Sequence, residues 1–192
     1  MEFKNSQTLL NLARSFAGES QAGLRYQMIV DMCTMQGYKT LGDEVKAIAK
    51  NEVNHAKVFF KLITDRLGNV NNIHFEAGYP FEGTSLEESL RFSMQQESDE
   101  GTKIYPEFAS VAENEGFPEI AEKFLQIAKV EKQHTLKFKY LYESIKNDTL
   151  YKGKQPVMWE CSECGHIETN ISAWNVCPLC NSSQGFVKLK LP

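Results

Sequence analysis

Hydrophobic residues recur at helical spacing through most of the first 150 residues of the chain. The pattern predicts two helices over about 5–35 and 40–67, each followed by a glycine suited to a helix end. A third helix should begin after Ser85, whose side chain can cap it together with Glu88, and end near residue 116. A fourth should begin at Pro118 and reach about residue 148. The N-terminal region is therefore predicted to be almost entirely helical.

The lengths of the connections indicate how these helices pack. Two turns are short, whereas residues 69–83 form a long connection between the second and third helices. This combination is typical of an all-α, ferritin-like four-helix bundle with one long crossover. Pro106 should kink the third helix. We expect the bundle to cover residues 1–150, followed by a linker over 151–156 and a small domain over 157–192, where Cys, Gly, Pro and Trp replace the helical periodicity.

Each apolar face is interrupted by glutamate near the middle of its helix. The interrupting residues are Glu19, then Glu52 and His55, then Glu97 and Glu100, then Glu131 and His134. The neighbouring apolar positions expected on these faces include Phe16 on the first helix and Ile104, Phe108 and Val111 on the third.

The interruptions fall at one level of the predicted bundle. Ionised carboxylates converging in an interior are very costly unless cations compensate them. One glutamate from each of two helices, with Glu-x-x-His from each of the other two, is the ligand set of di-metal carboxylate proteins. The spacing of three residues places the carboxylate and the imidazole on one helical face. A single such pair is common on surface helices, but four coincident interruptions predict a di-metal centre.

The cysteines indicate a second metal site. Four of the five lie in two close pairs, Cys161 with Cys164 and Cys177 with Cys180. Two such knuckles complete a tetrahedral four-sulfur site, which on geometry alone suits zinc or iron. Gly165 and Asn181 fit the positive-φ position after each knuckle. Trp159 and Trp174 can form a small aromatic core around the site.

Several motifs resemble those of rubrerythrins, and the resemblance covers nearly the whole chain. The motifs are Phe16-Ala17-Gly18-Glu19-Ser20-Gln21-Ala22, Asn51-Glu52-x-x-His55-Ala56, Glu97-x-x-Glu100 followed by Tyr105-Pro106-Glu107-Phe108-Ala109, and Glu131-x-x-His134. Cys177-Pro178-Leu179-Cys180 looks like a rubredoxin, so the resemblance implies iron at the four-cysteine site and two irons in the bundle.

The resemblance also implies a role for each ligand. Glu52 and Glu131 would bridge the two irons, Glu19 would bind one of them, and Glu97 with His134 the other. Glu100 and His55 would exchange as ligands when the site is reduced. These roles involve the residues Glu19, Glu52, His55, Glu97, Glu100, Glu131 and His134.

Two further features qualify these implied roles. Tyr26 and Tyr105 match tyrosines that hydrogen-bond to ligand carboxylates, although core packing is the alternative for both. Gly101 stands where relatives tend to carry a bulky residue, which leaves the details of the exchange at Glu100 open.

The activity implied is an NAD(P)H-linked peroxidase that reduces hydrogen peroxide to water and protects against oxidative stress. A reductase or rubredoxin would supply electrons through the four-cysteine iron, and a head-to-tail homodimer would shorten their path. The alternatives are a ferroxidase or iron-storage protein and a zinc-knuckle binding protein. Metal content separates these classes, because the redox interpretation needs iron at both sites.

Charge and composition narrow the partners. The net charge is −4, and no cluster of Lys and Arg indicates a nucleic acid or membrane partner. The apolar stretches are shorter than the roughly 20 residues that span a bilayer. The N-terminus has no charged segment leading into an apolar one, so we expect a cytoplasmic protein, where paired cysteines bind metals rather than form disulfides.

Overall fold

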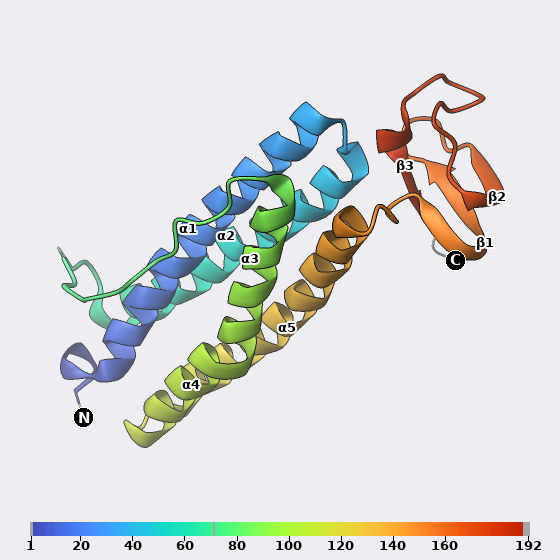
Figure 1. Ribbon diagram of the computed structural model, residues 1–192. Helices are drawn as coiled ribbons and strands as arrows, with labels where there is room; N and C mark the ends of the chain where they lie inside the picture. The colour runs from blue at the N-terminus through green and yellow to red at the C-terminus, as the bar shows by residue number, and fades with distance from the viewer. Residues whose placement is uncertain (1, 71, 190–192) are drawn as a thin grey trace.

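The computed structural model describes residues 2–70 and 72–189, which form a helical bundle with a small β-sheet region at one end (Figure 1). A short 3-10 helix, η1 (Phe3–Asn5), precedes the bundle. The four rods of the bundle are α1 (Gln7–Gln36), α2 (Lys39–Leu67), the combined α3 (Leu86–Asp99), η2 (Glu100–Ile104) and α4 (Tyr105–Asn114), and α5 (Pro118–Lys146). The crossover between α2 and α3 runs along the length of the bundle (Figure 1).

The helix ends follow the local signals in the sequence. Ser85 Oγ accepts a hydrogen bond from the backbone N–H of Glu88 at 3.2 Å, so the expected N-cap of α3 is confirmed. Pro118 occupies the first turn of α5, where its missing N–H costs no helical hydrogen bond. Gly37, at φ 79°, ends α1 in the left-handed conformation that glycine adopts without strain.

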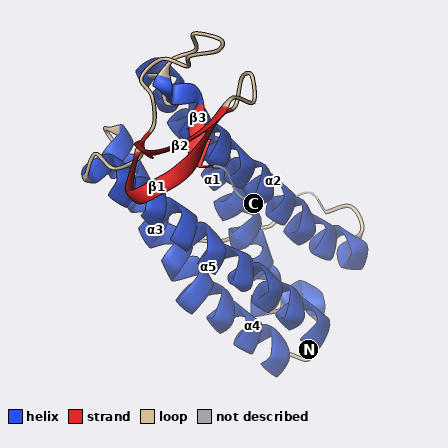
Figure 2. Cartoon of the chain, turned by 90° about the vertical axis from the view of Figure 1, so that its right-hand side faces the viewer, coloured by secondary structure: helices blue, strands red, loops and turns tan. Residues whose placement is uncertain are grey.

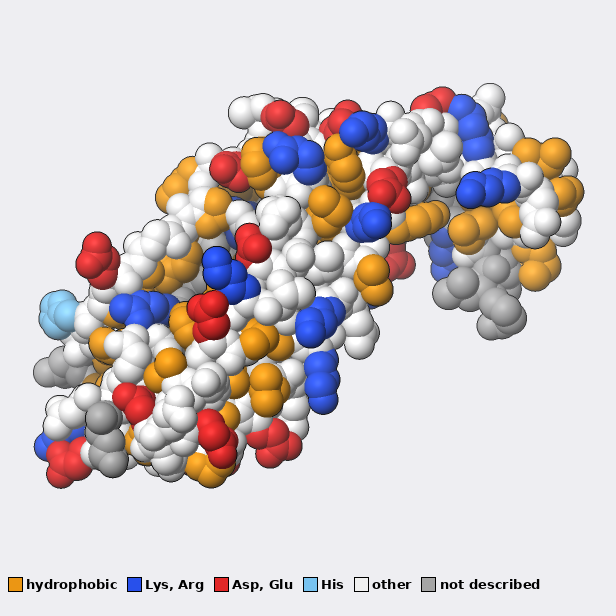
Figure 3. Space-filling model, turned by 60° about the horizontal axis from the view of Figure 1, so that its bottom comes forward, with side chains coloured by type: hydrophobic (Ala, Val, Ile, Leu, Met, Phe, Trp, Pro, Cys, Tyr) orange, Lys and Arg blue, Asp and Glu red, His pale blue; other side chains and the backbone are white. Residues whose placement is uncertain are grey.

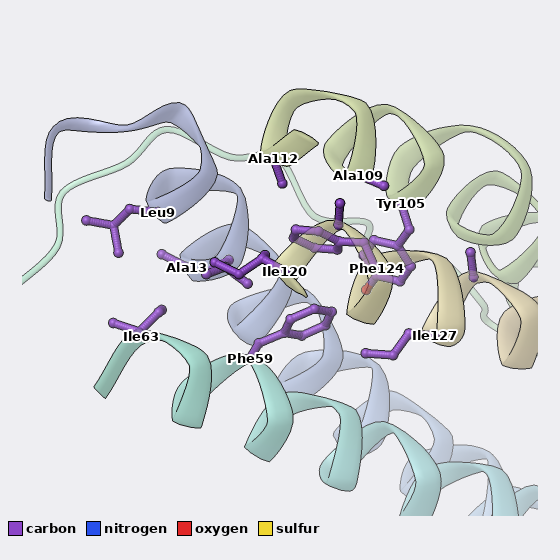
Figure 4. Packing of buried hydrophobic residues seen from close by; sticks show 13 residues of the cluster. Leu9, Ala13, Phe59, Ile63, Tyr105, Ala109, Ala112, Ile120, Phe124 and Ile127 are labelled. Carbon is purple, nitrogen blue, oxygen red and sulfur yellow. The ribbon is translucent and has the colours of Figure 1, made fainter. Parts of the chain in front are cut away.

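The bundle has two separate hydrophobic cores, one towards each end. Phe59, Tyr105 and Phe124 lie together in the first, between α2, α4 and α5 (Figure 4). Tyr26 and Phe138 pack in the second, with ring centroids 4.9 Å apart. On each rod, the glutamates expected as ligands lie in sequence between the residues of these two cores. The polar site therefore separates the two cores along the bundle.

The third rod differs from the sequence expectation. It contains a turn of π-helix, η2, and its buried face continues through Tyr105, Ala109 and Ala112. The expected buried positions lay one residue earlier, at Ile104, Phe108 and Val111, and each of these is only partly buried. A π-turn holds one more residue than an α-turn, so the face after it shifts by one position. The irregularity expected at Pro106 takes the form of this π-turn, which ends just before the proline.

Phe16 is a second correction. It was expected on the buried face of the first helix but is 38% exposed, and its ring lies 5.6 Å from that of Phe60 on the outside of the bundle. Ser15 is buried instead. An aromatic side chain at the edge of the apolar face of a helix can be either buried or exposed, so periodicity alone does not predict the burial of Phe16.

The C-terminal region is a three-stranded antiparallel sheet in the order β2-β1-β3 (Figure 2). Its elements are β1 (Lys152–Cys161), β2 (Ile167–Ser172), the 3-10 helix η3 (Gln184–Phe186) and β3 (Val187–Leu189). Trp159 is buried against Ala173 and Val187, with Trp174 packed beside them, which gives the expected aromatic core. β1 begins at Lys152, within residues 151–156 that the sequence suggested as a linker, and its pairing with β2 is irregular between Lys152 and Val157.

This sheet region contacts the turn between α1 and α2. Thr40 Oγ1 donates a hydrogen bond to the Val187 carbonyl at 2.9 Å. Gly185 packs so closely on Gly37 that a Cβ at position 185 would lie 1.7 Å from the Gly37 carbonyl oxygen. The contact therefore requires glycine at position 185.

The bundle surface carries acidic and basic side chains interspersed on the face shown in Figure 3. Among the described residues, no helix is both long enough and apolar enough to cross a membrane.

Candidate metal centres

The interior of the bundle gathers the glutamates and histidines that the sequence placed in its apolar faces. Five of them are no more than 2% exposed: Glu19, Glu52, Glu97, Glu131 and His134. His55 lies with them and is slightly exposed at the side chain. Their donor atoms form two groups, Glu19, Glu52, His55 and Glu131 in one and Glu52, Glu97, Glu131 and His134 in the other, each with all atoms within 4.8 Å of one another.

Glu52 and Glu131 belong to both groups, and each divides its two oxygens between them. Glu52 places Oε2 3.1 Å from His55 Nδ1 and Oε1 2.9 Å from His134 Nδ1. Glu131 places Oε1 3.0 Å from His55 Nδ1 and Oε2 2.8 Å from His134 Nδ1. A carboxylate that offers one oxygen to each of two neighbouring sites has the geometry of a metal bridge.

Glu19 and Glu97 complete the groups at opposite ends. Glu19 Oε2 lies 3.6 Å from His55 Nδ1, and Glu97 Oε2 lies 3.4 Å from His134 Nδ1. Each group therefore has one carboxylate of its own, one imidazole and two shared carboxylates. All four rods contribute, as the sequence predicted.

The shifted pKa values of these groups show that the buried carboxylates need positive charge beside them. Burial raises the pKa of Glu19 and of Glu97 well above the usual range, with neighbouring carboxylates adding to the effect. Burial also acts to raise the pKa of Glu52, but hydrogen bonds with His134 and His55 outweigh it and hold that pKa at about 2. Burial acts to lower the pKa of both histidines, yet the surrounding glutamates raise it to about 12 for His55 and about 11 for His134. Without metal ions, the raised pKa values keep protons on carboxylates and imidazoles of the site. Metal binding has to release these protons.

Unpaired atoms point the same way. Six buried atoms of this site make no well-formed hydrogen bond among the described residues, although several lie within ion-pair distance of one another: Glu19 Oε2, Glu52 Oε1, Glu97 Oε2, Glu131 Oε1, Glu131 Oε2 and His134 Nδ1. Buried polar atoms are rarely left unpaired, because each costs about 1–3 kcal/mol. Carboxylate oxygens and imidazole nitrogens are also the donors that iron prefers in such sites. The residues present therefore fit a pair of divalent metal ions.

Three residues around the ligands hold them in place. Tyr26 donates a hydrogen bond to Glu97 Oε1, and Tyr105 donates one to Glu19 Oε1. Burial, reinforced by those same carboxylates, raises the pKa of both phenols well above the usual range, so they remain donors. Asn51 Nδ2 lies 3.2 Å from His134 Nε2, a contact that the sequence did not predict although Asn51 precedes the Glu52-x-x-His55 motif.

Glu100 is the one expected ligand outside both groups. It lies in the first turn of η2, and His55 occupies the ligand group in its place. Burial of its carboxyl, with Glu131 and Glu52 nearby, raises the pKa of Glu100 to about 8, although Arg25 and His55 oppose this. The structure thus separates the two members of the expected exchange pair, with His55 inside and Glu100 beside the site.

The π-turn also accounts for Gly101. A Cβ at this position would lie 3.0 Å from Ala128 O, Lys132 N and Lys132 Cγ, which is tighter than nearly all such contacts. Glycine therefore lets η2 approach the backbone of α5 closely. The unusual residue at position 101 serves helix packing rather than leaving empty space beside Glu100.

The four paired cysteines meet at the other centre. The Sγ atoms of Cys161 and Cys180 are 3.8 Å apart and those of Cys164 and Cys177 are 3.7 Å apart, with all four cysteines free of disulfides. Gly165 and Asn181 have φ values of 75° and 63°, as expected after each knuckle. Two of the four cysteines are exposed, Cys164 and Cys180, so one side of the centre faces solvent.

Ser182 is a residue of this centre that the sequence did not indicate. Its hydroxyl lies 3.2 Å from the sulfurs of both Cys161 and Cys180. Burial acts to raise the pKa of Cys161, but the Ser182 hydroxyl and the backbone N–H groups of Cys164 and Glu163 together lower it to about 6. This environment therefore favours a thiolate at Cys161, the form that binds a metal.

Comparison with known proteins agrees with both centres. The rubrerythrin family profile matches residues 11–142 and 88–160. The chain belongs to the rubrerythrin family. It is 36% identical over 187 residues to a rubrerythrin of Clostridium perfringens, covering 97% of this chain and 95% of that protein. It is 34% identical over 183 residues to a rubrerythrin of Porphyromonas gingivalis, covering 95% and 90%.

Solved structures support the ferritin-like fold. Nigerythrin in a mixed-valence state is similar over 97% of this chain and 90% of its own, with a TM-score of 0.64 and 22% identity. The bacterioferritin of Desulfovibrio desulfuricans is similar over 76% of this chain and 84% of its own, with a TM-score of 0.65 and 21% identity. The expected fold, a ferritin-like four-helix bundle with a rubredoxin-like knuckle region, is confirmed.

Family membership and the two clusters together define the cofactors of this rubrerythrin. The carboxylate and histidine cluster is the di-iron site of the bundle, and the four cysteines form the rubredoxin-like iron site. The zinc-knuckle alternative loses its basis, because it required a bundle poor in metal ligands.

Proposed function

We propose that this rubrerythrin is a peroxidase that reduces hydrogen peroxide to water in the cytoplasm, with electrons entering one at a time at the four-cysteine iron. The observation that carries the proposal is the presence, in one chain, of a buried site for two metals and a partly exposed four-sulfur site. Iron storage requires only the first. A one-electron relay beside a two-metal site suits a reaction that consumes two electrons.

The balance of the reaction is H₂O₂ + 2 e⁻ + 2 H⁺ → 2 H₂O. When bound and reduced, the iron pair supplies the two electrons that break the O–O bond. An external reductase linked to NAD(P)H, or a rubredoxin, restores them through the four-cysteine site.

We assign the ligands from the way their oxygens and nitrogens are shared. Glu52 and Glu131 would bridge the two metal ions, since each offers one oxygen to each group. Glu19 would hold one metal ion at its end of the site. Glu97 and His134 would hold the other, while His55 and Glu100 would be the alternative ligands beside Glu19.

The residues around the ligands have positioning roles. Tyr105 fixes the Glu19 carboxylate and Tyr26 fixes the Glu97 carboxylate, each through its O–H. The two hydrophobic cores close the site from both ends of the bundle and exclude water there. Glu100 and His55 are the two ligand candidates that are partly rather than fully buried, and Glu100 lines the cavity beside the site.

The relay within one chain is long. The four-cysteine region contacts the α1–α2 turn, and α5 extends 12 residues from His134 to Lys146, or about 18 Å at the rise of an α-helix. We therefore propose a head-to-tail homodimer in which the four-cysteine iron of one subunit serves the di-iron site of the other.

A complementation experiment tests the relay. Cys161→Ser removes the first electron acceptor, and Glu52→Ala removes a shared ligand of the di-iron site, so each variant alone should be inactive. We expect activity to return when the two are unfolded, mixed and refolded together, because mixed dimers contain one complete path. If the mixture stays inactive while wild-type protein refolded in the same way is active, the path runs within one chain.

Peroxide turnover itself is tested by anaerobic reduction followed by stoichiometric hydrogen peroxide. We expect three irons per chain, rapid reoxidation of the di-iron site and slower reoxidation of the four-cysteine iron. A protein that ignores peroxide but oxidises added ferrous iron with oxygen and retains it would instead be a ferroxidase.

A further inference from the structure

A cavity of about 400 Å³ lies beside the di-iron site, beneath the crossover. Glu100 and Tyr105 line it, and Tyr105 donates its hydrogen bond to the ligand Glu19. Residues 76–80 of the crossover line the cavity as well. The cavity therefore extends from the crossover to two residues that belong to or touch the site.

The crossover wall is fixed by hydrogen bonds. Arg14 Nε donates to the Glu76 carbonyl at 2.9 Å, and the Tyr79 hydroxyl donates to the Arg14 carbonyl at 2.9 Å. The Tyr79 ring lies 3.6 Å from the place that a Cβ at Gly18 would take. These hydrogen bonds fix the crossover against α1, with the Tyr79 ring packed between them. The crossover therefore forms a fixed wall of the pocket.

The volume of the pocket exceeds what hydrogen peroxide requires. One water molecule takes up about 30 Å³ of liquid volume, and hydrogen peroxide has only one heavy atom more. Pockets of about 300–1,000 Å³ are typical of organic ligands. Ile104, Phe108 and Pro80 give this pocket apolar walls.

One polar group in the wall lacks a partner. Ser15 is 4% exposed and lines the pocket, and its Oγ has no hydrogen-bond partner among the described residues. A buried hydroxyl without a partner costs about 1–3 kcal/mol. Its oxygen atom has almost no accessible surface, so a ligand in the pocket would contact mainly the apolar walls.

The charges around the pocket restrict that ligand further. Glu76, Asp99 and Glu107 line it against a single cation, Arg14, and Glu100 lies at the site itself. Excess negative charge disfavours an anionic ligand. The pocket therefore suits a neutral molecule.

We propose that this pocket binds neutral organic hydroperoxides and that the chain reduces them to alcohols. The inference rests on the proposed peroxidase function, whose site it extends to a second class of substrate. The O–O bond breaks with uptake of two electrons and two protons, ROOH + 2 e⁻ + 2 H⁺ → ROH + H₂O. The electrons come from the same external one-electron donor that serves the reaction with hydrogen peroxide.

The test uses the iron-loaded, full-length protein. Reduced protein is mixed with hydrogen peroxide, with cumene hydroperoxide or with linoleic acid hydroperoxide, and the rate constant of di-iron reoxidation is measured. We expect cumene hydroperoxide to react well and the carboxylate-bearing hydroperoxide poorly. Ser15→Leu fills the pocket and should lower the ratio of the cumene hydroperoxide rate to the hydrogen peroxide rate by about tenfold or more, the effect of losing contact with about two methylene groups. Ser20→Leu makes the same change at an exposed serine of α1 and should keep the wild-type ratio.

A binding measurement separates this inference from the peroxidase proposal. Cumyl alcohol, the product, should bind the oxidised protein in calorimetric titration, and Ser15→Leu should abolish that binding. Reaction with hydrogen peroxide but neither reaction with cumene hydroperoxide nor binding of cumyl alcohol overturns the organic substrate alone. Binding of cumyl alcohol to a protein inert towards every peroxide supports the pocket and overturns the peroxidase function. An equal ratio in wild-type protein and Ser15→Leu shows that the reaction does not use this pocket.

Discussion

Replacing Gly101 by alanine sets two physical effects against each other. In an ordinary helix interior, glycine to alanine stabilises the fold by about 1 kcal/mol. At Gly101 the new Cβ would lie 3.0 Å from two backbone atoms of α5, Ala128 O and Lys132 N. Backbone atoms yield less readily than the end of a side chain, and overpacking of this kind costs about 1–3 kcal/mol. We expect the packing cost to cancel or exceed the gain in helix propensity.

Gly18 offers the matched control, because its Cβ would meet only the Tyr79 ring at 3.6 Å, an ordinary contact. Gly18→Ala should therefore be more stable than Gly101→Ala by about 1–3 kcal/mol, the full packing cost. Thermal unfolding of the two metal-free variants should then differ by about 2 to 12 °C, at about 2–4 °C per kcal/mol. If Gly101→Ala unfolds at or above the temperature of Gly18→Ala, the close approach of η2 to α5 does not explain the glycine.

Three further variants test individual contacts. Gly185→Ala should detach the sheet region from the bundle, because its Cβ would overlap the Gly37 carbonyl. Small-angle scattering should then show a larger radius of gyration, and an unchanged radius would refute the contact. Tyr105→Phe should weaken metal binding about 10- to 100-fold in competition with a chelator, and wild-type affinity would show that its hydrogen bond does not hold the ligand. Cys177→Ser should lose one iron per chain and the thiolate absorption, whereas Cys33→Ser, in the bundle core, should retain both; full iron content in the first variant would contradict the four-cysteine site.

Much of the site could be predicted from the sequence, because its logic is local to each helix. A glutamate within an apolar face has to lie in the interior, and the spacing of Glu52 and His55 places both on one side of α2. The knuckles were predictable for the same reason, since each pair of cysteines fixes its own turn. The caps at Ser85 and Pro118 were equally local.

The features that sequence analysis missed depend on contacts between segments. The π-turn at Glu100–Ile104 carries no periodicity signal of its own, and the shift to Tyr105 becomes visible only once α5 is in place. The packing role of Gly101 could not be predicted, because the backbone of α5 cannot be located from the sequence. The role of Asn51 depends on His134, 83 positions later in the chain.

The division of the bundle into two apolar cores has a consequence for its motions. In an ordinary helix the ends fray first and the middle exchanges its amide hydrogens slowest. In this protein without metal, the middle of each rod carries buried carboxylates, while each end is packed around aromatic residues. Amide exchange in the metal-free protein should therefore be fastest near Glu52 and Glu131, and the iron pair should slow it there first. The bound metals thus act as the central clamp of a bundle whose two ends are already closed.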